Sequence, residues 1–204
     1  MIAIVNYGLG NVQAVANIYR SKNIAVTIAS DPAELRKADR VILPGVGAFD
    51  RAMELLDQSG MRETVDDLAL VQKRPVLGIC VGMQMMADRS EEGSRPGLGW
   101  IPGEVKRFDV ASLGQRTHLP HMGWNDVVPR EGSSLFRQLE TDARFYFLHS
   151  YYFAPTGADS MLATTCYGTT YASSVARENI FGVQFHPEKS HQWGIQLLLN
   201  FARL

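Results

Sequence analysis

Apolar and polar residues alternate with two different periods along the first half of the chain. Short continuous apolar runs, typical of buried strands, are separated by segments whose apolar residues recur every three or four positions, as in helices. The runs lie at residues 2–5, 24–29, 40–43 and 75–79, and the helical segments at 12–19, 49–56, 61–71 and 83–87. This order predicts an α/β fold with an open, mostly parallel sheet and helices on both faces.

After residue 87 the pattern changes to short strand-like segments broken by Gly, Pro and Asp. These segments lie at residues 104–108, 124–128, 145–153, 161–166, 173–177 and 180–185. We predict that they are antiparallel strands that extend or flank the sheet in the C-terminal half. A last helix is expected at 191–203, and no repeat or linker interrupts the chain, so we expect one domain over residues 1–204.

Composition narrows the possible environment and partners. The chain carries 20 Lys and Arg against 21 Asp and Glu, for a net charge of -1, which gives no basic surface for nucleic acid or anionic membrane. Its two cysteines, Cys80 and Cys166, are too far apart for a CxxC site and too few for a disulfide framework. Because the first residues have no basic flank or cleavage-like site, we expect a strand there and a cytoplasmic protein.

Cys80 is the first candidate catalytic residue. It follows the apolar run at 75–79, precedes a helical segment, and is flanked by Gly78 and Gly82. This pattern predicts a sharp strand-to-helix turn that presents the thiol above the sheet, near the positive end of a helix dipole that favours the attacking thiolate. The competing interpretation is a free cysteine acting as a small core hydrophobe.

His186 and Glu188 form the second candidate group. They stand two residues apart at the end of the last apolar run, so in an extended chain both side chains face the same way. A histidine oriented by a carboxylate is the base that a thiol nucleophile needs. The sequence therefore predicts a Cys80–His186–Glu188 triad, although a surface histidine beside a solvated glutamate is the alternative.

Three separated motifs resemble those of the class I, triad-type glutamine amidotransferases. They are GICVGMQ around Cys80, PGVG at 44–47 and QFHPEKS at 184–190. The resemblance covers essentially the whole chain. It implies a flavodoxin-like sheet and hydrolysis of glutamine to glutamate and ammonia through a Cys80 thioester, with no cofactor and no metal.

The resemblance also implies roles for residues around the triad. The N–H of Val81, with a second N–H from Gly45 or Val46, would form the oxyanion hole. The expected substrate-binding positions are Gln84, Glu92, which has Glu91 as a neighbour, and the backbone of Ser150 and Tyr151.

Three further motifs resemble one branch of the family, whose glutaminase subunits supply ammonia to a (β/α)8 cyclase subunit in histidine biosynthesis. They are NYGLGN at 6–11, LPHMGWN at 119–125 and HSYY at 149–152. Such a barrel takes about 250 residues, so it must be a separate chain, and the pair a heterodimer. The resemblance places Met122, Trp124, Asn125 and Lys189 at that interface, and suggests that the Gly45–Val46 peptide is a donor switched by the partner.

Alternative functions remain open on the sequence alone. One is the glutaminase subunit of another synthase, in the anthranilate, aminodeoxychorismate or pyridoxal phosphate pathway. Another is a non-catalytic regulatory protein that keeps the fold. Dinucleotide binding at Gly8–Gly10 is disfavoured because Gln13 stands where the third glycine belongs, and metal binding is disfavoured because the histidines fit no known spacing. The segment 104–115 matches no motif and receives no role.

Overall fold

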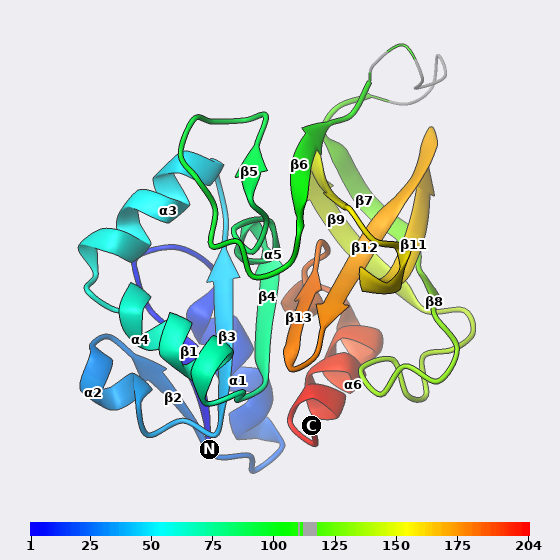
Figure 1. Ribbon diagram of the computed structural model, residues 1–204. Helices are drawn as coiled ribbons and strands as arrows, with labels where there is room; N and C mark the ends of the chain where they lie inside the picture. The colour runs from blue at the N-terminus through cyan, green and yellow to red at the C-terminus, as the bar shows by residue number, and fades with distance from the viewer. Residues whose placement is uncertain (110, 112–117) are drawn as a thin grey trace.

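The computed structural model describes residues 1–109, 111 and 118–204, so part of the unassigned segment 104–115 lies outside the described residues. Its main element is an eight-stranded sheet in the order β2-β1-β3-β4-β13-β12-β11-β8 (Figure 1). The bounds are β1 Ile2–Val5, β2 Val26–Ala29, β3 Arg40–Gly45, β4 Val76–Cys80, β8 Val128–Pro129, β11 Met161–Tyr167, β12 Thr169–Arg177 and β13 Ile180–Val183.

Five neighbouring strands of this sheet, β2-β1-β3-β4-β13, are parallel, and β12, β11 and β8 continue it antiparallel. This confirms the predicted mostly parallel sheet with added antiparallel strands. The order 2-1-3-4 followed by a fifth parallel strand is that of flavodoxin-like folds. The prediction that the segment 180–185 is antiparallel was wrong with respect to β4, because the chain returns to the sheet centre and pairs β13 parallel to it.

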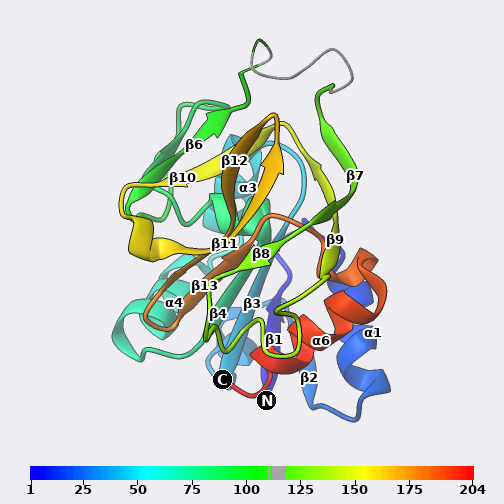
Figure 2. The ribbon, with the colours of Figure 1, turned by 90° about the vertical axis from the view of Figure 1, so that its right-hand side faces the viewer.

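Helices cover both faces of the parallel strands. They are α1 Val12–Ser21, α2 Pro32–Leu35, α3 Phe49–Gln58, α4 Arg62–Asp66, α5 Val81–Gln84 and α6 His191–Phe201. A π-helical segment, η1 Asp67–Val71, continues α4, and η3 Ala158–Ser160 and η4 Pro187–Lys189 are 3-10 turns. Figure 2 shows α4 on one side of the sheet and α1 and α6 on the other. Every residue of β1 and of β4 is buried, as expected for strands covered on both faces.

Two small sheets flank the carboxyl ends of the parallel strands. One has the order β10-β6-β5, and the other pairs β7 with β9. Their bounds are β5 Arg89–Ser90, β6 Gly103–Arg107, β7 His121–Asp126, β9 Arg144–His149 and β10 Tyr151–Pro155. The single strand predicted at 145–153 is therefore two strands, broken at Ser150, because its halves pair with different partners.

Glycines allow the turn between β4 and α5 to pack against β3. A Cβ at Gly82 would lie 1.9 Å from the carbonyl oxygen of Leu43, and a Cβ at Gly78 would lie 2.6 Å from the carbonyl oxygen of Gly82. Neither contact can be relieved by a side-chain movement, since both involve backbone atoms. This close packing holds the end of β4 against the end of β3.

Among the described residues, no helix combines the length and the hydropathy needed to cross a membrane.

Gly82→Ala should destabilise the protein strongly. The added methyl overlaps the backbone of β3, and overpacking of this kind typically lowers the free energy of unfolding by about 1–3 kcal/mol. Urea unfolding measures the change. Gly157→Ala is the control, because a Cβ there meets nothing within 4 Å, and its free energy of unfolding should stay within about 0.5 kcal/mol of wild type. Equal stability of the two variants would contradict the packing argument.

Candidate active site

Cys80 occupies the strained position of a strand-to-helix turn. It is the last residue of β4 and the N-cap of α5, with φ 54° and ψ −114°. A positive φ is unfavourable for a residue with a Cβ, and strain of this kind costs about 1–3 kcal/mol and clusters at functional sites. The residue is only 3% exposed, so the predicted presentation of the thiol is to a cavity and not to the outer surface.

The cavity has a volume of about 500 Å³ and is open to solvent on one side. Cys80 and His186 line it together with Val46 and Val81. Four residues predicted to bind substrate also line it, namely Gln84, Glu92, Ser150 and Tyr151. Segments from β4, α5, the loops after β3, β5 and β9, and the turn after β13 thus converge on one hollow.

His186 is held between the thiol and a carboxylate. Its Nδ1 lies 2.9 Å from Oε1 of Glu188, and its ring hydrogen bonds with the Cys80 side chain. Burial disfavours the imidazolium, but the hydrogen bonds and negative charges of Cys80 and Glu188 outweigh burial and raise the pKa of His186 to about 10. The three side chains therefore form the predicted constellation.

The predicted reason for the His186–Glu188 contact was wrong. β13 ends at Val183, and Pro187–Lys189 form the 3-10 turn η4 instead of extended chain. His186 itself is extended, as expected for a residue before proline. The turn folds Glu188 back beneath the imidazole, so its side chain is only 3% exposed.

Asn11 gives Glu188 a second hydrogen bond. Asn11 ends the NYGLGN motif and is the N-cap residue of α1, yet its side chain makes no cap hydrogen bond, and Nδ2 donates to Glu188 Oε1 at 2.8 Å. Burial raises the pKa of Glu188, but the hydrogen bond and charge of His186, with the Asn11 bond, lower it overall. Glu188 is therefore held as the carboxylate that fixes the imidazole.

The loop after β3 supplies the candidate oxyanion donors. Val81 opens α5, where the first backbone N–H groups have no acceptor within the helix. Val46 lines the main cavity and also, together with Gly45, a smaller hollow. Tyr7, which the sequence did not single out, donates its hydroxyl to the Pro44 carbonyl at 2.6 Å and so anchors the base of this loop.

Gln84 is held in a buried amide network and is not a free helix residue. Its Nε2 donates to the Tyr151 carbonyl and to Oε1 of Gln184, both at 3.0 Å. Gln184 Nε2 in turn lies 3.8 Å from Cys80 Sγ. Gln184 stands within the same motif as His186, which was the signal that could have identified it.

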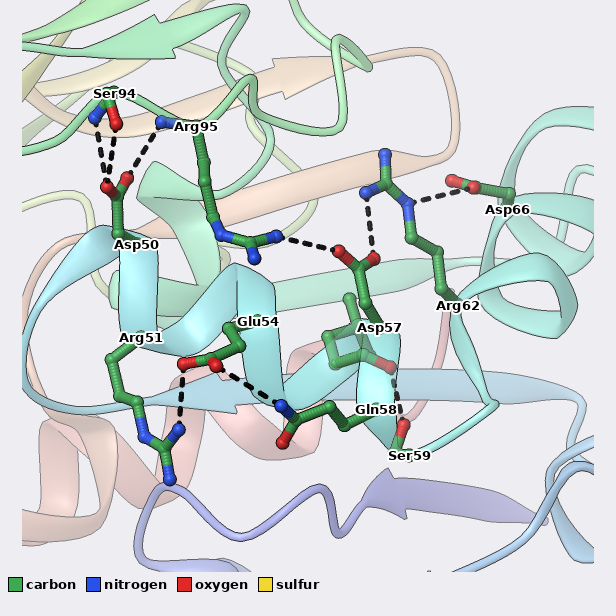
Figure 3. A network of polar contacts seen from close by, with 11 residues as sticks. Asp50, Arg51, Glu54, Asp57, Gln58, Ser59, Arg62, Asp66, Ser94 and Arg95 are labelled. Carbon is green, nitrogen blue, oxygen red and sulfur yellow. Dashed lines mark hydrogen bonds and ion pairs between the residues drawn. The ribbon is translucent and has the colours of Figure 1, made fainter.

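Glu92, and not Glu91, faces the cavity. Glu92 Oε2 accepts from the N–H of Phe49 at the start of α3, at 2.9 Å, whereas Glu91 accepts from the N–H of Arg107. The loop that carries Glu92 is tied to the same helix end, since Asp50 accepts hydrogen bonds from Ser94 and Arg95 (Figure 3). The Glu92 carboxylate is thus held at the N-terminus of α3, in a fixed position on the cavity wall.

Ion pairs extend this attachment along the outer face of α3. Arg95 pairs with Asp57 at 3.3 Å, Asp57 with Arg62 at 3.0 Å, and Arg62 with Asp66 at 3.6 Å (Figure 3). These side chains are partly exposed, so each pair contributes little to stability by itself. Their position links the Glu92 loop to both α3 and α4.

The four residues assigned to a partner interface lie around the cavity and on strand β7. Lys189 lines the cavity and lies over the Tyr146 ring, 5.6 Å from its centroid. Trp124 stacks on His191 at 5.3 Å between ring centroids and is 38% exposed, while Met122 is 61% exposed. Asn125 is half-buried on the same strand.

Metal binding gains no geometric support in the described part of the chain. Within residues 1–109, 111 and 118–204, no three His, Cys, Asp or Glu side chains gather in a way that could hold an ion.

A sequence profile of the family described as glutamine amidotransferase class-I matches residues 3–203. The chain belongs to this family.

Curated relatives match the amidotransferase over its full length. It is 54% identical over 204 residues to the imidazole glycerol phosphate synthase subunit HisH of Bdellovibrio bacteriovorus, with all of both chains covered. It is 46% identical to the protein of the same name from Leptospira interrogans, again with complete coverage of both chains. The predicted family is thereby confirmed.

Solved structures of low sequence identity share the fold of the amidotransferase. The crystal structure of a glutamine amidotransferase matches with a TM-score of 0.73 and 17% identity, over 100% of this chain and 99% of that one. PurLQS from Thermotoga maritima matches with a TM-score of 0.72 and 14% identity, over 99% and 97%.

Replacing Glu188 should change how the stability of the amidotransferase depends on pH. Because folding lowers the pKa of Glu188, its stabilisation is present above the pKa of an unfolded glutamate, about 4.3, and is lost as the pH falls through the folded value. The melting temperature of wild type should exceed that of Glu188→Gln near pH 7, with a gap that narrows as the pH falls below the unfolded value of about 4.3. Thermal unfolding across this range measures the gap, and a constant gap would contradict the assignment.

Proposed function

We propose that this chain hydrolyses L-glutamine to glutamate and ammonia. The observation that carries the proposal is the joint presence, in one cavity, of a thiol on a strained strand-to-helix turn and a histidine oriented by a buried carboxylate. Membership of the glutamine amidotransferase family supports it.

In the proposed mechanism, Cys80 Sγ attacks the side-chain amide carbon of glutamine. His186 accepts the thiol proton and passes it to the amide nitrogen as the carbon–nitrogen bond breaks and ammonia leaves. A water molecule then attacks the thioester, His186 accepts its proton, and glutamate departs with Cys80 restored. Glu188 holds the imidazole in the tautomer and orientation that both proton transfers require.

Backbone N–H groups are assigned to stabilise the negative charge on the oxygen of the tetrahedral intermediates. The Val81 N–H at the start of α5 supplies one donor beside the nucleophile, and Val46 or Gly45 supplies the second N–H from the loop after β3. Loss of one such donor typically lowers the rate about a hundredfold or more. The Gly45–Val46 peptide is the donor that we expect a partner to switch, since Tyr7 anchors only the carbonyl that precedes it.

Recognition of the amino-acid end of glutamine is assigned to four other residues that line the cavity. The Ser150 and Tyr151 backbone offers groups for the α-carboxylate and α-amine, while Gln84 and the Glu92 carboxylate are further polar side chains that line the cavity. These four residues come from α5, the β5 loop and the β9–β10 break. Their roles are part of the proposal.

We propose that the ammonia is used by a separate (β/α)8 cyclase subunit in histidine biosynthesis, in a cytoplasmic heterodimer. Support comes from relatives at 54% and 46% identity that carry the name imidazole glycerol phosphate synthase subunit HisH. The docking surface would include Met122, Trp124, Asn125 and Lys189, since Met122 and Trp124 are exposed apolar side chains and Lys189 lines the cavity. Residues 1–204 act as one glutaminase domain in this assembly.

Glutamate release from glutamine tests the proposal. The purified chain should hydrolyse glutamine faster when the candidate cyclase partner and the nucleotide ligand of that partner are added, and Cys80→Ala should lower kcat by a factor of about 10⁴ or more. Cys166→Ala, which changes the exposed cysteine, is the control and should retain the wild-type rate. Activity that survives in Cys80→Ala would refute the assigned nucleophile, and no activity under any condition would refute the assigned function.

Substitution of Met122 tests the docking surface. Met122 and Val128 are similarly exposed, at 61% and 65%, so a lysine at either position should fold normally. Met122→Lys should weaken binding to the cyclase partner by about tenfold or more, since buried anchors carry most interface energy. Val128→Lys should bind as wild type. Calorimetric titration measures both, and equal affinities would remove Met122 from the interface.

A further inference from the structure

A buried polar cluster adjoins the cavity, which its member His149 helps to line, and takes no part in the chemistry above. It consists of His121 on β7, His149 at the end of β9 and Tyr171 on β12, which are 2%, 6% and 3% exposed. His121 Nδ1, His149 Nε2 and the Tyr171 hydroxyl form a triangle with sides of 3.2, 3.1 and 3.1 Å. Three strands from three parts of the chain meet there.

Both ends of the cluster determine the direction of its hydrogen bonds. At one end His149 Nδ1 lies 2.8 Å from the Tyr151 carbonyl, which can only accept, so Nδ1 carries the proton and Nε2 is the acceptor. At the other end Asn125 Nδ2, which also donates to the Cys166 carbonyl, lies 3.3 Å from His121 Nε2. That nitrogen therefore accepts, and His121 carries its proton on Nδ1.

One arrangement then satisfies every group in the cluster. His121 Nδ1–H donates to the Tyr171 oxygen, and the Tyr171 hydroxyl donates to His149 Nε2. These hydrogen bonds form a chain, called the relay below, that runs in one direction from Asn125 through His121, Tyr171 and His149 to the carbonyl of Tyr151. Burial lowers the pKa of His121 to about 4 and that of His149 to about 3, and raises the pKa of Tyr171, so all three side chains are neutral near pH 7.

Aromatic contacts hold the rings of this cluster in place. His121 is stacked between Phe147 and Tyr167, at centroid distances of 4.6 and 3.9 Å. Tyr171 meets the Phe108 ring edge-on at 5.1 Å. A side chain packed on two faces has few alternative rotamers, so its hydrogen bonds are fixed in direction.

The Tyr151 carbonyl joins this cluster to the nucleophile. It accepts from His149 Nδ1 and also from Gln84 Nε2, and Gln84 leads through Gln184 to Cys80. One carbonyl oxygen thus takes two hydrogen bonds, which restrict the orientation of the backbone that follows Ser150. That backbone lies on the cavity wall assigned above to the amino-acid end of glutamine.

We propose that His121, His149 and Tyr171 are positioning residues that hold the Ser150–Tyr151 backbone in the orientation required to bind glutamine. Through Asn125 they connect the β7 surface to this wall. The inference rests on the proposed glutaminase function for its substrate, but the direction of the relay stands on the geometry alone. The residues act through the Tyr151 backbone and do not touch the reacting atoms.

Nitrogen NMR of the histidine rings tests the relay without reference to activity. In ¹⁵N-labelled protein near neutral pH, both His121 and His149 should be neutral and protonated on Nδ1. Free neutral histidine is protonated mainly on Nε2, so protonation of both rings on Nδ1 reports the relay directly. Protonation of His149 on Nε2, or a charged ring at that pH, would overturn the proposal.

Two substitutions of His149 test its role in substrate binding. His149→Asn places an amide N–H where Nδ1 stands, so the bond to the Tyr151 carbonyl is kept. His149→Gln carries its amide one bond further out and loses that donor. The KM for glutamine should stay within about twofold of wild type in His149→Asn and rise about five- to tenfold in His149→Gln, the effect of one lost hydrogen bond, with kcat changed less.

Tyr19, a buried tyrosine away from the cavity, provides a control for a general loss of stability. The Tyr19 hydroxyl donates to the Leu198 carbonyl between α1 and α6 and does not line the cavity. Tyr19→Phe should lower the melting temperature with no change in KM. Equal KM values for His149→Asn and His149→Gln, at comparable melting temperatures, would overturn the positioning role.

Labelling of Cys80 separates failure of this inference from failure of the proposed function. Iodoacetamide should label wild type and both His149 variants at similar rates, whereas a glutamine-shaped diazoketone should label His149→Gln about five- to tenfold more slowly at subsaturating concentration. Wild type that resists the glutamine-shaped reagent would refute the glutaminase function, and the ring-nitrogen spectra would still decide the relay. Equal diazoketone rates in all three proteins would refute the positioning role alone.

Discussion

The site depends on the close packing of the β4–α5 turn against the end of β3. Cys80 is held at a positive φ because the backbone on either side of it is fixed, by β4 in the sheet and by α5 lying on Leu43. Only glycine at position 82 allows this approach. The same contact brings the loop after β3 beside the thiol, so the candidate nucleophile and the candidate oxyanion donors are placed by one constraint.

The return of the chain to the sheet centre places the candidate base. After the antiparallel strands, β13 pairs parallel to β4, and its continuation reaches His186 beside Cys80. Burial would normally keep this imidazole neutral. The neighbouring carboxylate, fixed by η4 and by Asn11, offsets that effect. The carboxylate that orients the imidazole is thus held by a hydrogen bond between Asn11 and Glu188, which lie 177 positions apart in the sequence.

The part of the cavity wall around Gln84, Tyr151 and Glu92 is held by hydrogen bonds to backbone groups. Gln84 and His149 both donate to the Tyr151 carbonyl, and Glu92 accepts from the start of α3. Each of these side chains is buried or partly buried, so an unmatched donor or acceptor would cost free energy. Because the donors belong to neighbouring elements, a shift in one strand would change the hydrogen bonds along the wall. This coupling is the physical basis of the inferred relay.

The sequence alone predicted the α/β class and the strained turn at Cys80, because local period and flanking glycines depend on neighbouring residues. It also named the three candidate triad residues, through the chemistry of their side chains and through motifs that resemble those of the family. It did not determine that residues 145–153 divide at Ser150, that β13 lies parallel to β4, or that Glu188 folds back in a 3-10 turn. Those outcomes depend on which strands pair, and pairing joins residues far apart in the chain. The side-chain partners of Tyr7, Asn11, Gln184 and His149 were decided only in the folded protein, because a hydrogen bond between distant segments leaves no periodic signal in the sequence.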